Sequence, residues 1–145
     1  MRVDKEALVR IAKDAGLKGI SMHMADAAQL NATVYPEIGA LLITRGLIEA
    51  LTPAQLLVVL AHEVSHVERE EYMGCPEGYE WTDVRKACEY KADEDALATI
   101  IKKGMDGHIV IETLEAILGD MDDKDDTCSL HPTIKARIEN IRRLI

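Results

Sequence analysis

His62, Glu63 and His66 form the pattern His-Glu-x-x-His, in which two imidazoles lie four residues apart and a carboxylate follows the first. On an α-helix these two positions lie on the same face one turn apart, so both rings can reach one metal ion. Zinc lowers the pKa of a bound water from about 15.7 to about 7, and a neighbouring carboxylate can accept the proton as that water attacks a carbonyl. The pattern therefore predicts a hydrolytic zinc site with Glu63 as general base.

The residues before this motif predict the helix that it needs. Thr52 is suited to cap a helix, Pro53 to occupy its first turn and Gln55 to complete a capping box. Residues 56–61 are apolar on nearly every side, which predicts a helix buried in the middle of the domain. The alternative is an ordinary helix with two exposed histidines and a solvated glutamate.

A third ligand is expected downstream, because catalytic zinc sites usually have three protein ligands and a water. Residues 82–103 predict a second helix, opened by Thr82 and stopped by Gly104. Glu89 and Asp93 lie one turn apart within it. We expect Glu89 to be the third ligand and Asp93 to accept a hydrogen bond from a ligating histidine. The spacing equally allows both acids to pair with nearby basic residues on a solvated face.

The two motifs together resemble gluzincin metallopeptidases of the CaaX prenyl endopeptidase and HtpX-like family. The segment from Glu89 to Asp93 is similar to the second half of the gluzincin signature. Ser65 is a departure, since the family usually has glycine there. Further matches extend over residues 31–137: Asn31-Ala32 before residues 39–46, the apolar approach to the first ligand from Leu56 to His62, and His131-Pro132 with Arg137.

The resemblance implies a role for each residue of the two helical motifs. His62, His66 and Glu89 would bind zinc, with one ion per chain. Glu63 would act as general base and later as general acid, and Asp93 would orient a ligating histidine. The chain looks most like the small minigluzincin catalytic cores, so prenylated substrates of the membrane enzymes are not carried over.

Three further predictions concern the surroundings of the site. The resemblance implies that Arg137 braces the site and that His131 lies near the tetrahedral intermediate, where a hydrogen-bond donor stabilises the developing oxyanion. As plain chemistry, a histidine before proline is more often a helix cap. We expect Asn31 and Ala32 to belong to an edge strand that binds an extended peptide by strand addition. Both are alternatively ordinary structural residues.

Length and composition predict a single domain over residues 1–145, with a hydrophobic content of 48 %. Because there is no Phe and one Trp, the core must be mostly aliphatic. We expect an α+β, zincin-like fold in which a small sheet packs on the zinc-binding helix and a mostly helical part follows. Beyond the two helices above, the expected elements are a helix over 4–15 stopped by Gly16, extended pieces at 18–24 and 31–35, a strand at 40–44, and helices near 107–118 and 132–144.

The formal charge of −9 argues against nucleic acid as a partner, because phosphates would be repelled. The longest strictly apolar run, residues 56–61, is far below the roughly 18 residues of a membrane span. Cys75, Cys88 and Cys128 match no paired C-x-x-C framework, which favours a reducing cytoplasm. A disulfide between Cys75 and Cys88 is the alternative to free thiols.

We therefore expect a zinc-dependent endopeptidase that acts on extended peptide or protein segments. One alternative is a repressor-cleaving ImmA-like zinc peptidase, although Glu-x-x-Ala-Asp and His-Pro-x(4)-Arg point away from it. A second is a latent enzyme whose cleft is closed by its own termini or by a second copy in a homodimer. A third is a non-catalytic, zinc-stabilised interaction module, against which the intact Glu63 argues.

Overall fold

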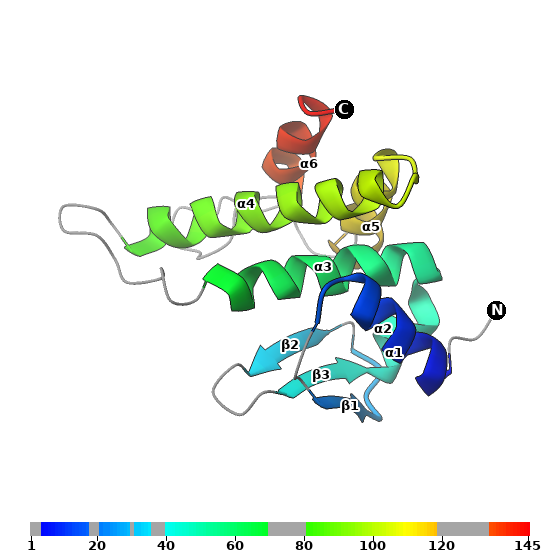
Figure 1. Ribbon diagram of the computed structural model, residues 1–145. Helices are drawn as coiled ribbons and strands as arrows, with labels where there is room; N and C mark the ends of the chain where they lie inside the picture. The colour runs from blue at the N-terminus through cyan, green and yellow to red at the C-terminus, as the bar shows by residue number, and fades with distance from the viewer. Residues whose placement is uncertain (1–3, 18–20, 30, 36–39, 70–80, 119–133) are drawn as a thin grey trace.

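A computed structural model describes residues 4–17, 21–29, 31–35, 40–69, 81–118 and 134–145 of the chain (Figure 1). The structure is mostly helical with a small sheet, which is compatible with the predicted α+β class. In chain order the elements are α1 (Lys5–Asp14), β1 (Ser21–Ala25), β2 (Ala32–Tyr35), β3 (Ala40–Thr44), α2 (Arg45–Ala50), α3 (Pro53–Arg69), α4 (Trp81–Lys102), α5 (His108–Leu118) and α6 (Ile134–Arg142).

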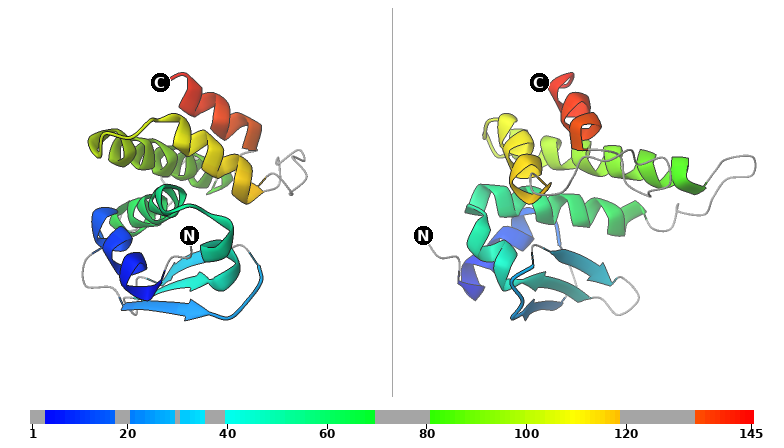
Figure 2. Two further views of the ribbon diagram at one scale, coloured as in Figure 1. Left: turned by 90° about the vertical axis from the view of Figure 1, so that its right-hand side faces the viewer. Right: turned by 180° about the vertical axis from the view of Figure 1, so that it is seen from behind.

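Helix α3 lies in the middle of the structure, between the sheet on one side and α4, α5 and α6 on the other (Figures 1 and 2). It contacts α1, β2, α4 and α5. Helices α3 and α4 run in opposite directions, as the colours in Figure 1 show. None of the described helices combines the length and apolar content that crossing a membrane requires.

The sheet has the strand order β1-β3-β2, with β1 parallel and β2 antiparallel to the central β3. Strand β2 is therefore an edge strand, and it is the strand that lies against α3. Thr44 closes β3 and caps α2, since its Oγ1 accepts a hydrogen bond from the Leu47 amide at 3.3 Å. The same oxygen accepts from the Asn31 amide at 3.1 Å, which fixes the start of β2 beside the end of β3.

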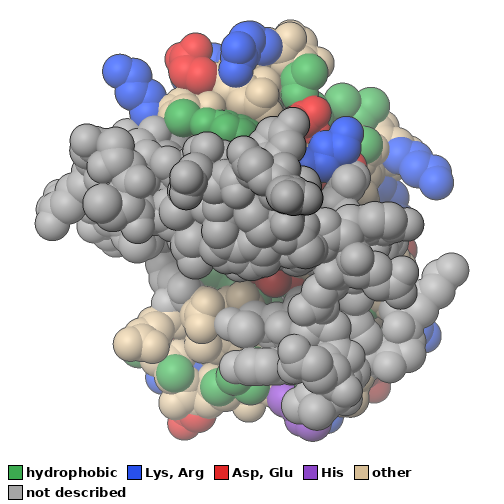
Figure 3. Space-filling view, turned by 90° about the vertical axis from the view of Figure 1, so that its left-hand side faces the viewer, with side chains coloured by type: hydrophobic (Ala, Val, Ile, Leu, Met, Phe, Trp, Pro, Cys, Tyr) green, Lys and Arg blue, Asp and Glu red, His purple; other side chains and the backbone are tan. Residues whose placement is uncertain are grey.

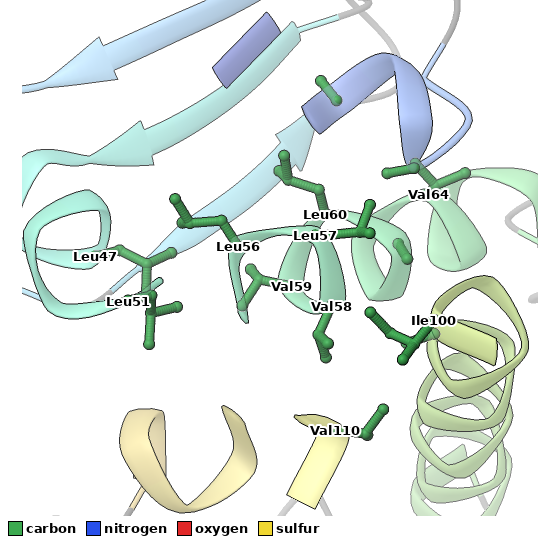
Figure 4. Close-up of a cluster of buried hydrophobic side chains, with 14 of the residues drawn as sticks. Leu47, Leu51, Leu56, Leu57, Val58, Val59, Leu60, Val64, Ile100 and Val110 are labelled. Carbon is green, nitrogen blue, oxygen red and sulfur yellow. The ribbon is translucent and has the colours of Figure 1, made fainter. Parts of the chain in front are cut away.

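The capping box predicted at the start of α3 is present. The Gln55 amide donates to Thr52 Oγ1 at 3.2 Å, and the Thr52 amide donates to Gln55 Oε1 at 3.0 Å. The apolar residues that follow are buried on all sides of the helix, as predicted. Leu56 and Leu60 point to one side of α3 and Val58 to the other (Figure 4).

Helix α4 packs against α3. Ala92 and Ala96 on α4 are both 0 % exposed, and side chains this small permit the close approach of a neighbouring helix. The helix ends at Lys102, one residue before the predicted end, and is followed by Gly104 with φ +77°. Close packing of these two helices brings the second acidic motif to the face of α3 that carries His62.

Gly46 in α2 offers a test of how the sheet connects to the helices. A Cβ at this position would lie 2.1 Å from the carbonyl oxygen of Ala28. We expect Gly46→Ala to lower the free energy of unfolding by about 1–3 kcal/mol, the usual range for overpacking. Alanine favours a helix over glycine by ~1 kcal/mol, so propensity alone predicts the opposite sign. Urea unfolding measures this change in free energy. A variant as stable as wild type would refute the close approach of Gly46 to the Ala28 carbonyl.

Candidate metal centre

His62, Asp93 and Arg137 form a buried chain of hydrogen bonds that joins α3, α4 and α6. His62 Nδ1 lies 2.9 Å from Asp93 Oδ1. Arg137 donates to both oxygens of the same carboxylate, from Nε to Oδ2 and from Nη2 to Oδ1, each at 2.8 Å. A carboxylate only accepts, so Nδ1 is the donor, and a neutral ring held in this way has its lone pair on Nε2. This tautomer is the one that binds a metal through Nε2.

Glu89 lies beside Nε2 of the same ring. Its Oε2 is 3.3 Å from His62 Nε2, and the residue is 6 % exposed. Two ligand atoms, each about 2.1 Å from a tetrahedral zinc ion, are about 3.4 Å apart. A nitrogen and an oxygen donor from α3 and α4 therefore have a separation that fits one zinc ion.

The charges around His62 also suit a cation. Burial lowers the pKa of His62, but its hydrogen bonds with Asp93 and Glu89 outweigh this and raise it to about 9. Burial likewise raises the pKa of Asp93, yet the hydrogen bonds from Arg137 and His62 hold it below its ordinary value. Neither acid lies on a solvated face, since Glu89 is 6 % and Asp93 is 2 % exposed. Negative charge is thus concentrated around the His62 ring.

Glu63 follows His62 on α3 and is half-buried. Burial lowers the pKa of Arg137, but Asp93, Glu89 and the charge of Glu63 raise it. The Glu63 carboxylate therefore belongs to the same electrostatic cluster. Acidic side chains of the described residues are visible between the sheet and the C-terminal helices when the molecule is viewed from the end where α3 stops (Figure 3).

Two predicted site residues have side chains outside the described part. His66 lies on α3 one turn after His62, but its side chain is not described. His131 lies in residues 119–133, outside the described residues, and Cys75 and Cys128 are also outside them. Within the described side chains, no group of three or more His, Cys, Asp or Glu could hold a metal ion.

Asn31 and Ala32 lie at the start of the edge strand. The Asn31 amide donates to Thr44 Oγ1 at 3.1 Å, and its carbonyl accepts from the Thr44 amide at 3.0 Å. The main chain of Asn31 is therefore directed at β3. Because hydrogen-bonded and non-hydrogen-bonded pairs alternate in an antiparallel ladder, the N–H and C=O of Ala32 point away from β3, to the side of β2 that no described strand pairs with.

One polar contact near the cluster has no counterpart in the sequence-based prediction. Ser65 Oγ donates a hydrogen bond to Asp95 Oδ2 at 2.6 Å, across the interface of α3 and α4. Ser65 stands out in the sequence only as a departure from the resembled motif, and Asp95 has no spacing signal of its own.

Residues 4–73 of the chain match the model of peptidase family M48. The matched region takes in α1 to α3, with His62, Glu63 and His66, and ends before Glu89. No solved structure matches the chain significantly. The family match supports a peptidase whose activity depends on a metal and whose substrates are peptides or proteins. The similarity extends over residues 4–73, just under half of the chain, and this region resembles metallopeptidases of the M48 family.

Proposed function

We propose that the protein is a zinc-dependent endopeptidase of the minigluzincin type, acting on extended peptide or protein segments in the cytoplasm. One observation carries the proposal. His62 Nε2 and Glu89 Oε2 lie 3.3 Å apart, while Asp93 holds the other nitrogen of the same ring at 2.9 Å. A ring oriented in this way, next to a buried carboxylate on a neighbouring helix, is the arrangement of a metal ligand and its supporting acceptor.

His62, His66 and Glu89 would hold one zinc ion per chain. Two imidazoles and one carboxylate are a ligand set of catalytic zinc sites. The ion, when bound, polarises a carbonyl and makes water a stronger acid. The position of His66 one turn after His62 on α3 supports its inclusion, because residues at this spacing share a helix face.

The protein's own residues then carry the protons. Glu63 takes a proton from the attacking water on its carboxylate and later delivers it to the leaving amide nitrogen. Asp93 keeps the His62 proton on Nδ1, and Arg137 balances the charge of the buried carboxylate. The bidentate contact of Arg137, with both bonds at 2.8 Å, supports this positioning role.

The substrate would lie along the open edge of β2. The outward N–H and C=O of Ala32 can pair with an extended peptide, as strand addition requires, and β2 lies against the helix that carries Glu63. Asn31 would contact the same peptide through its exposed side chain, since its main chain is used by Thr44. His131 would donate a hydrogen bond to the oxyanion that develops on the scissile carbonyl.

Metal analysis tests the proposal. We expect the purified protein to contain about one zinc ion per chain and His62→Ala or Glu89→Ala to lose it, because two ligands hold zinc poorly. Glu115→Ala, at an exposed position of α5, is the matched control and should keep the ion. Undiminished zinc in Glu89→Ala would exclude it as a ligand, with Asp93 the first candidate to replace it. No zinc in the wild-type protein would refute the proposed function.

A further inference from the structure

The hydrogen bond between Ser65 and Asp95 lies in the interface that holds the candidate metal centre. Ser65 is 2 % exposed, and its Oγ donates to Asp95 Oδ2 at 2.6 Å, the length of a charge-assisted O–H···O⁻ bond. Ser65 is on α3 between His62 and His66, and Asp95 is on α4 two residues after Asp93. The bond therefore joins the two helices that carry all three proposed ligands.

Apolar contacts between α3 and α4 do little to fix the rotation of one helix against the other. Ala92 and Ala96 on α4 are fully buried and present only methyl groups. Apolar contact of this kind is non-directional, whereas a hydrogen bond weakens steeply when its angle changes. The His62 to Asp93 bond supplies one directional contact, and a second at a different position prevents the helices from pivoting about the first.

The Ser65 to Asp95 bond uses no atom of a proposed ligand. The contacts of His62 with Asp93 and Glu89, in contrast, involve the ring that would bind the ion. The bond from Ser65 can therefore be identical with and without metal. A contact that persists in the metal-free protein can hold ligand side chains in place before the ion arrives, which lowers the ordering cost of binding.

We propose that Ser65 and Asp95 are positioning residues that set the rotation of α3 against α4, so that the ligand side chains on the two helices face one another before zinc binds. This inference rests on the proposed function, because it concerns the same metal site. It predicts that the pair acts on zinc affinity as a unit, and not only on the stability of the fold.

Zinc affinity of the folded protein, measured by competition with a chromophoric chelator, tests the pair. We expect Ser65→Ala and Asp95→Ala each to weaken zinc binding roughly tenfold, the lower end of the range for residues that support metal ligands. The double variant should lose little more than either single one, because both remove the same bond. Asp95→Asn keeps a partner for the Ser65 hydroxyl and should retain most of the affinity.

Thr113→Val is the matched control. Thr113 is a buried hydroxyl residue, 1 % exposed, whose Oγ1 donates within α5 to the Ile109 carbonyl at 2.7 Å. Loss of this hydrogen bond should lower the midpoint of urea unfolding and leave zinc affinity unchanged. A merely structural role for Ser65 would give the same result as this control.

The outcomes separate this inference from the proposed function. Equal zinc affinity in wild type, Ser65→Ala and Asp95→Ala would overturn the inference alone. Independent, additive losses in the double variant would also overturn it, because the two residues would then act separately. A wild-type protein that binds no zinc would overturn the proposed function and the inference with it. If Ser65→Ala does not fold, the comparison of Asp95→Ala with Asp95→Asn decides, since Asp95 is half-buried.

Discussion

Glu63→Gln is expected to lower kcat/KM for peptide cleavage by roughly 10²- to 10⁴-fold, the range that general acid–base catalysis contributes. Glutamine keeps the size and helix propensity of glutamate but cannot take a proton from water. Zinc content and the urea midpoint should stay close to wild type, because Glu63 is neither a proposed ligand nor part of the apolar core. The substitution therefore removes the general base and leaves the fold and the proposed zinc ligands unchanged.

An unbiased peptide-library digest, read by mass spectrometry, would first find a cleaved sequence on which the rates are compared. Glu112→Gln makes the same chemical change at an exposed position of α5 and should leave the rate unchanged. Equal cleavage by Glu63→Gln and wild type, with contaminating protease excluded, would refute Glu63 as the base. A zinc-stabilised interaction module would instead bind zinc and cleave no peptide in either form.

Arg137→Ala is expected to lower the free energy of unfolding by about 3–5 kcal/mol, the usual loss when one partner of a buried ion pair is removed. Asp93 is 2 % exposed and accepts two hydrogen bonds from Arg137 at 2.8 Å. Without the guanidinium, the negative charge of Asp93 stays buried with fewer hydrogen bonds and no neighbouring Arg137 charge to stabilise it. Arg137→Lys keeps the charge but not the bidentate geometry, so it should lower the free energy of unfolding by an intermediate amount.

Arg142→Ala is the control on the same helix. Arg142 is exposed and forms an ion pair with Glu139 at 3.5 Å, also at the surface. Surface pairs contribute about 0–1 kcal/mol, so this change should be nearly neutral in the same urea experiment. If Arg137→Ala were no more destabilising than Arg142→Ala, the buried pair would not hold α6 to α4.

The local structure around the site was predictable where neighbouring residues decide it. Thr52 and Gln55 lie three positions apart, and their reciprocal capping bonds follow from that spacing. Gly104 ends α4 because it adopts a positive φ that other residues avoid. The α2 helix was not predicted, because six residues with a glycine at the second position give too short a periodic pattern.

Contacts between distant residues were predictable only in part. A hydrogen bond between Asp93 and a ligating histidine was expected, because a metal ligand needs such a partner. The sequence did not show that this histidine would be His62. The bond between Ser65 and Asp95 spans 30 residues and follows no periodicity. It depends on the packing of α3 against α4, which is decided by the apolar core rather than by either residue.

The ion pair between Arg137 and Asp93 also sets an order of events during protein synthesis. Asp93 precedes its partner by 44 residues, so a ribosome releases the carboxylate well before the guanidinium. Until α6 has left the exit tunnel, the Asp93 carboxylate of the nascent chain has no guanidinium partner, which makes its burial less favourable. Full closure of α3 against α4 is then less favourable as well. The buried cluster of His62, Asp93 and Arg137 is therefore completed only after α6 has been synthesised.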